Sequence, residues 1–120
     1  MKKILWVSRH EMTKGQVDDL RRIYGEFELV KFDQTVSNIK EIIEAGKECD
    51  ILAVVLPPAL LADLVNPRNN GKPVIRAVAN RVETGNEVLN PATGQKELEY
   101  KFAHVAWEQV LKIEIITKKL

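Results

Sequence analysis

Short apolar runs alternate with segments of helical periodicity along the first two-thirds of this 120-residue chain, and this alternation constrains the fold most. Four runs are too short for helices, so they predict strands over residues 3–8, 26–32, 50–56 and 74–79. Three segments between them place apolar residues on one helical face and predict helices over residues 13–25, 37–46 and 59–65. This order predicts an α/β fold: a Rossmann-like, three-layer open sheet with parallel strands in the order 2-1-3-4.

Residues with known preferences for helix ends mark the limits of two of these helices. Thr13 and Gln16 have the spacing of a capping box, in which each side chain accepts a hydrogen bond from the other residue's backbone N–H. Gly25 is well placed to end the first helix. Pro57 and Pro58 stop the third strand, and proline is tolerated in the first turn of the helix that follows.

The last third of the chain has a different character. Residues 81–90 and 97–107 predict two strands joined by a hairpin at the turn sequence Asn-Pro-Ala-Thr-Gly. Residues 108–117 alternate and predict a final strand. We interpret this part as a C-terminal antiparallel extension of the sheet. The chain has the length of one domain, so we expect a single domain over 1–120, with a core at 1–79 and the extension at 80–120.

Composition and charge exclude several classes of protein. The net charge is +1, so nothing indicates the broad basic surface by which proteins bind duplex nucleic acid. The apolar run near the start is too short for a signal peptide, and no run approaches the roughly 18 apolar residues of a membrane span. We therefore expect a cytoplasmic protein that has no membrane partner.

The sequence contains no motif for a metal or a cofactor. Its one cysteine, Cys49, excludes an intrachain disulfide and precedes an apolar run, so we expect a buried thiol. With His10, His104 and Cys49 as the only soft ligands, we expect no metal site. The GxGxxG, P-loop, GxSxG and CxxC patterns are absent, which argues against dinucleotide oxidoreductases, Walker-type phosphotransferases and α/β-hydrolases. We expect no cofactor.

Polar residues follow the first predicted strand at the place where this fold binds ligands. In an open parallel sheet the ligand crevice lies at the carboxyl ends of the strands where the strand order reverses, here between the first and third strands. The predicted ligand-binding residues are Ser8, Thr13, Leu56, Pro57, Pro58 and Arg76. The predicted catalytic residues are Arg9, whose guanidinium can bind phosphate, and His10, which can transfer a proton near neutral pH.

Each of these residues also has a purely structural interpretation. Ser8, Arg9 and His10 would then simply end a strand, and Thr13 would only cap the first helix. Arg76 interrupts an apolar run, so it either faces a ligand or pairs with a carboxylate at the sheet edge.

The chain start also resembles the Arg-His-Gly-Glu-Thr motif of histidine phosphatases. Glu11 replaces the glycine that lets the backbone approach phosphate, so we set that family aside.

Several short motifs occur in a particular order along the chain. A strand is followed by Ser-x-His-x-x-Thr-x-x-Gln and a helix, and later come Leu-Pro-Pro at 56–58, Lys-Pro-Val-Ile-Arg at 72–76 and Leu-Lys-Ile-Glu-Ile-Ile at 111–116. Together they resemble the small CRISPR-associated Rossmann-like (CARF-related) proteins proposed as stand-alone ring nucleases. Those proteins bind, and in some cases degrade, cyclic oligoadenylate second messengers.

The resemblance implies a metal-independent reaction and a symmetric assembly. A ribose 2′-OH would attack the neighbouring phosphorus while Arg9 or Arg76 stabilises the phosphoryl charge and His10 transfers a proton. Ser8 and Thr13 would position phosphate oxygens. A homodimer could bind the cyclic ligand across its twofold axis. The setting would be CRISPR signalling or counter-defence.

Two other functions fit the same residues. One is a nucleotide sponge or sensor that uses the same pocket without chemistry. The other is a small protein-interaction module, of phage or bacterial origin, whose hairpin end binds a partner while the strand ends stay inert.

Overall fold

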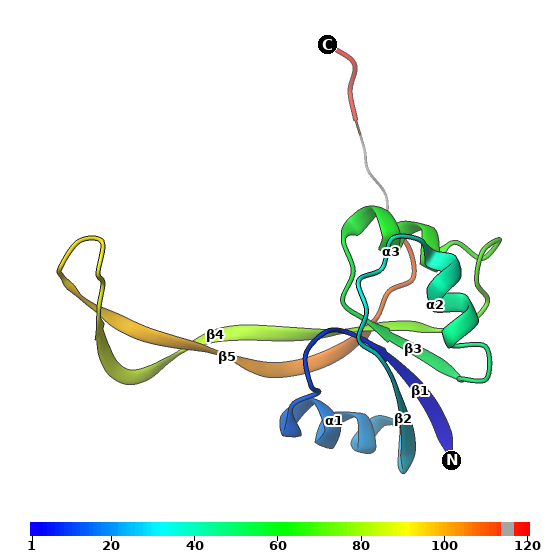
Figure 1. Ribbon diagram of the computed structural model, residues 1–120, viewed down its shortest axis with the longest axis horizontal. Helices are drawn as coiled ribbons and strands as arrows, with labels where there is room; N and C mark the ends of the chain where they lie inside the picture. Colours follow the sequence, from blue (N-terminus) through cyan, green and yellow to red (C-terminus); the bar gives the residue numbers. More distant parts are fainter. Residues whose placement is uncertain (114–116) are drawn as a thin grey trace.

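The computed structural model describes residues 1–113 and 117–120, which form a five-stranded sheet with helices on both faces (Figure 1). The elements are β1 (Lys2–Val7), α1 (Lys14–Tyr24), β2 (Phe27–Phe32), α2 (Ile39–Ala45), β3 (Ile51–Val54), α3 (Pro58–Val65), β4 (Val74–Leu89) and β5 (Lys96–Gln109). The strand order is β2-β1-β3-β4-β5, with parallel pairing among the first four strands and antiparallel pairing between β4 and β5. The predicted α/β class is confirmed, and β5 extends the predicted order as a fifth strand of the same sheet.

The central strands are buried on both faces because their alternate residues enter two separate cores. Leu5 and Val7 of β1 point to the face covered by α2 and α3, where they pack with Leu52. Ile4 and Trp6 point to the opposite face, which α1 covers. This two-sided burial explains why β1 and β3 are almost continuously apolar in the sequence.

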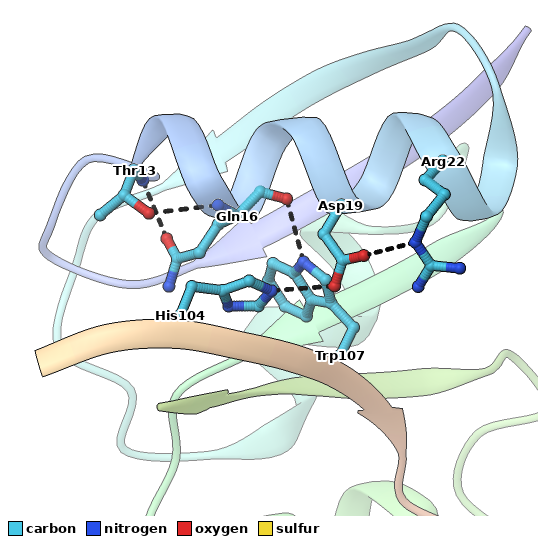
Figure 2. Close-up of polar contacts among 6 residues, drawn as sticks. All are labelled: Thr13, Gln16, Asp19, Arg22, His104 and Trp107. Carbon is cyan, nitrogen blue, oxygen red and sulfur yellow. Dashed lines mark hydrogen bonds and ion pairs between the residues drawn. The ribbon is translucent and has the colours of Figure 1, made fainter. Parts of the chain in front are cut away.

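Helix α1 begins where the capping box predicts. Thr13 Oγ1 accepts a hydrogen bond from the Gln16 backbone N–H at 3.2 Å, and Gln16 Oε1 accepts one from the Thr13 backbone N–H at 2.9 Å (Figure 2). Gly25 follows the helix with a φ of 76°, a backbone conformation that L residues with side chains adopt at a cost. The two ends of α1 are therefore set by local sequence.

A half-buried polar contact joins α1 to β5 (Figure 2). His104 Nε2 lies 2.9 Å from Asp19 Oδ2, and the Trp107 indole N–H donates to the Gln16 carbonyl at 3.0 Å. Arg22 Nε also donates to Asp19, at 2.8 Å. The His104 side chain is only 8% exposed, and its Nδ1 has no hydrogen-bond partner. The tautomer with its proton on Nε2 suits this site, because it donates to the carboxylate and leaves no N–H unpaired.

Strands β4 and β5 form one long hairpin that projects beyond the rest of the molecule (Figure 1). The hairpin predicted from residues 81–107 is present. β4 runs through residue 79, the expected limit of the core, and its register with β5 shifts there, between Val78 and Ala79. The extended shape appears in the radius of gyration, which is 17.5 Å; a compact domain of this length would have about 14 Å.

The predicted strand over 108–117 is wrong in the residues that the structure describes. β5 ends at Gln109, and residues 110–113 are not a strand; residues 114–116 lie outside the described part. The Val110 N–H donates to the Val74 carbonyl, and the next residue before β4 that would face β5 is Lys72, whose backbone N–H and carbonyl both bond to the Asn70 side chain instead. Val110 and Ile113 instead pack against the core beneath α2 and α3.

The assigned core predicts that two leucine-to-alanine substitutions differ strongly in their effect on the free energy of unfolding. Leu52 is 1% exposed and Leu111 is 76% exposed. Leu52→Ala should lower the free energy of unfolding by about 2–5 kcal/mol, because it removes packed methyl groups and leaves a cavity. Leu111→Ala should change it by about 0.5 kcal/mol or less. Chemical denaturation measures both, and equal losses would contradict the assigned core.

The Asp19 contacts predict a specific dependence of stability on pH. Hydrogen bonds from His104 and then from Arg22 lower the pKa of Asp19 below its ordinary value. A carboxylate whose folded-state pKa is lowered stabilises the fold above its unfolded pKa of about 4, and this contribution disappears as the pH falls through the folded pKa. Asp19→Asn should therefore be less stable than the wild type at pH 6, and the gap should narrow below about pH 4.

The neighbouring Asp18→Asn variant is the matched control for this titration. It leaves both hydrogen bonds to Asp19 in place and should retain the pH profile of the wild type. Denaturation at a series of pH values measures the three proteins, and parallel profiles for Asp19→Asn and wild type would contradict the role of Asp19.

Candidate functional site

A pocket of about 360 Å³ opens at the carboxyl ends of β1, β2 and β3. The segments that line it are residues 7–10 after β1, 34–36 after β2 and 55–57 after β3. β1 lies between β2 and β3 in the sheet, so the pocket is at the point where the strand order reverses. Its volume falls within the range of about 300–1,000 Å³ that is usual for small-molecule sites.

Three hydrogen bonds hold the loop that carries Arg9 and His10. The Ser8 backbone N–H donates to the Phe32 carbonyl at 3.2 Å, which continues the β1–β2 ladder past the end of β1. The His10 backbone N–H donates to Ser8 Oγ at 3.1 Å, and the Trp6 indole N–H donates to the His10 carbonyl at 2.9 Å. The backbone of the loop is thus tied to the sheet and to the core, while the Arg9 and His10 side chains remain exposed.

The charges around the pocket favour an anion. Arg9 and His10 line it, and no acidic residue of the described part of the chain does. Glu11 and Asp33 each adjoin a lining residue along the chain, and Glu11 forms an ion pair with Lys31. Helix α3 begins at the pocket rim, where Pro57 provides no side-chain cap for the first turn. The amino end of a helix presents free N–H groups and a positive dipole to a negatively charged ligand.

The structure brings some of the predicted site residues together and separates others. Ser8, Arg9, His10, Leu56 and Pro57 line the same pocket. Three other predicted residues lie outside its lining: Thr13, Pro58 and Arg76.

Each of the three residues outside the pocket has a structural role. Thr13 caps α1, and Pro58 is the first residue of α3. Arg76 Nε lies 2.5 Å from Glu108 Oε1, so its partner is a carboxylate on β5, as the structural interpretation of the sequence held. Arg76 also lines a smaller hollow of about 170 Å³, which shares Val55 and Leu56 with the main pocket.

Sequence reasoning missed the third side of the pocket. Gln34 and Thr35 follow β2 and contribute an amide and a hydroxyl to the lining. Their signal was present in the sequence, because residues just after any strand that neighbours β1 lie at the same edge of a parallel sheet. Only the two strands that flank the switch point were considered.

The described residues, 1–113 and 117–120, contain no group of three or more histidine, cysteine, aspartate or glutamate side chains arranged to hold a metal ion. Cys49 is buried, and burial raises the pKa of its thiol, which favours the unreactive protonated form. Within the same residues, no helix has the length and apolar character needed to cross a bilayer.

Comparisons with known proteins assign no family to this chain. No family model matches it. Searches of curated proteins and of solved structures likewise return no match. The geometry and chemistry of the pocket are therefore what indicates a function for this chain.

Proposed function

We propose that this chain is a Rossmann-like domain that binds a small nucleotide of the cyclic oligoadenylate class in the pocket at the ends of β1, β2 and β3. The observation that carries the proposal is the convergence of three strand ends on a pocket that Arg9 and His10 line and that no carboxylate of residues 1–113 or 117–120 lines. A phosphate-bearing ligand matches both the charge and the position of that pocket.

The lining residues supply the contacts that a nucleotide requires. Arg9 offers a planar pair of donors to a phosphate group. Ser8, Gln34 and Thr35 add polar groups for the ribose and phosphate oxygens. The apolar side is formed by Val36, Val55, Leu56 and Pro57, and a base can pack against it.

The same residues support a cleavage reaction without a cofactor. The ribose 2′-OH attacks the adjacent phosphorus, the bond from phosphorus to the 5′-oxygen breaks, and the products are a 2′,3′-cyclic phosphate and a free 5′-OH. In this proposal His10 takes the proton of the attacking hydroxyl or gives one to the leaving oxygen. Arg9 stabilises the charge on the phosphoryl oxygens. Arg76 is not needed for this step, because it is paired with Glu108.

A ring of several nucleotides exceeds what one pocket of this size can enclose. A homodimer would supply a second pocket, and a twofold axis would duplicate the contacts to a symmetric ring. We therefore include a homodimer in the proposal.

Binding without cleavage is the second candidate function. His10 is exposed and is the one imidazole that lines the pocket, whereas acid–base catalysis at both oxygens needs either two groups or one that serves twice. A sponge or sensor needs only the phosphate and base contacts.

Two substitutions in the pocket distinguish these functions. Arg9→Ala should weaken binding of cyclic oligoadenylates about 10- to 100-fold, since a hydrogen bond to a charged group contributes about 1.5–3 kcal/mol. His10→Ala should retain most binding and slow cleavage by about 10²- to 10⁴-fold. Calorimetry measures the binding, and chromatography of the incubated ligand measures the cleavage.

Arg68→Ala is the matched control, because Arg68 lies in the loop before β4 and does not line the pocket. It should behave as the wild type. Binding that leaves the wild-type ligand intact would select the sponge or sensor. If the wild type binds no cyclic oligoadenylate of any ring size, both versions of the proposal are wrong.

A further inference from the structure

The projecting part of the β4–β5 hairpin, residues 80–103, exposes several large apolar side chains to solvent. We call this segment the arm. Its exposed apolar residues are Val88, Leu89, Leu98, Tyr100 and Phe102. The chain has three phenylalanines, and one of them, Phe102, is 78% exposed. A two-stranded ribbon by itself is only marginally stable in water, so an arm of this length calls for a packing partner.

The outer edge of β5 is open for pairing. β5 is the last strand in the sheet order, and among the described residues no strand pairs with its outer side. Such an edge presents a row of backbone N–H and carbonyl groups that another strand can complete. β5 is 14 residues long, whereas edge strands that avoid association are usually short.

The side chains of β5 divide into an apolar face and a charged face along the arm. Successive residues of a strand point to opposite sides, so Leu98, Tyr100 and Phe102 share one face. Glu99 and Lys101 share the other face. Glu99 also accepts side-chain hydrogen bonds from its own hairpin, from Thr84 Oγ1 at 2.7 Å and from Asn86.

This pattern is complementary to itself in one antiparallel register. When two copies of β5 pair about a twofold axis at Tyr100, Leu98 of one copy lies opposite Phe102 of the other, and Glu99 lies opposite Lys101. Each of these pairs occurs twice. Axes at Glu99 or at Lys101 would place two like charges opposite each other, which is unfavourable.

The charge of the arm also favours a second copy over a nucleic acid. Residues 80–103 contain three basic and four acidic side chains, and the acidic ones would repel a phosphate backbone. Opposite charges at alternating positions suit a partner that carries the same alternation.

We propose that two copies of this chain pair edge to edge through β5, antiparallel and centred on Tyr100, so that the two arms form a four-stranded sheet. Leu98, Tyr100 and Phe102 from both copies form an apolar strip along the middle of one face of that sheet, flanked on each β4 by their register partners Glu87, Glu83 and Arg81. Opposite-charge pairs between Glu99 and Lys101 lie on the other face. This pairing is separate from the association that a shared ring would require, because its twofold axis passes through the arm, and the arm and the pocket have no residue in common.

A charge exchange tests the partner and the register together. In sedimentation experiments the wild type should have about twice the 13.6 kDa mass of one chain. Lys101→Glu or Glu99→Lys should weaken the dimer about ten-fold or more, because each converts two attractive pairs into repulsive ones. The double variant Glu99→Lys/Lys101→Glu should recover the dimer. Lys40→Glu, on α2, is the control and should leave it unchanged.

Two further variants keep the test decisive if a charge variant folds poorly. Phe102→Ser removes an exposed ring and should give a folded monomer. Tyr100→Cys should form a disulfide between copies under mild oxidation, because directly opposite residues have Cα atoms about 4.5–5.5 Å apart, within disulfide range. Val105→Cys, outside the central pairs, should crosslink far less.

Two results would overturn the proposal: a wild type that is monomeric at about 100 µM, far above the Kd of a stable homodimer, or a dimer that is indifferent to all of these changes. A monomer whose β5 edge instead binds an extended segment of another protein would also overturn it.

Discussion

Burial of β1 and β3 between two apolar layers is the constraint on which the rest of the structure depends. Their side chains alternate between the core under α2 and α3 and the core under α1, so neither strand can shift by one residue without exchanging its two faces. Because the strands are parallel neighbours, their carboxyl ends meet at one edge of the sheet. The loops that carry Arg9, His10 and Pro57 begin at that edge. The pocket is thus a consequence of strand packing, and β2, which pairs with the other side of β1, brings Gln34, Thr35 and Val36 to the same edge.

The sequence predicted the body of the fold because its signals there are local. Each strand of the core is an apolar run with helix ends on either side, and Thr13, Gln16 and Gly25 mark the limits of α1 by contacts within a few residues. The order of the strands then determines which loops lie at the switch point. This is why the sequence could place Ser8, Arg9 and His10 beside Leu56 and Pro57.

What the sequence left open or predicted wrongly concerns contacts between residues far apart in the chain. Arg76 pairs with Glu108, 32 residues away, and that pairing depends on a register between β4 and β5 that a bulge shifts at Val78 and Ala79. The strand predicted over 108–117 has the right alternation, but the backbone of Lys72, which would continue the ladder, bonds to the Asn70 side chain. The alternation of apolar and polar residues over 81–107 predicted strands, but it did not indicate that the hairpin they form projects beyond the rest of the molecule. Whether a strand lies against a core depends on the whole tertiary arrangement.

One indole connects the pocket loop to the part of β5 that packs in the core. Trp6 packs edge-on against Trp107 of β5, with ring centroids 5.9 Å apart, and its N–H holds the carbonyl of His10 in the pocket loop. A ligand that approaches this loop therefore meets a backbone already ordered by the folding of the core. Association would then sacrifice little chain entropy, so even a few polar contacts can yield useful affinity. Rigidity at this rim comes from an aromatic pair in the interior and needs no lid.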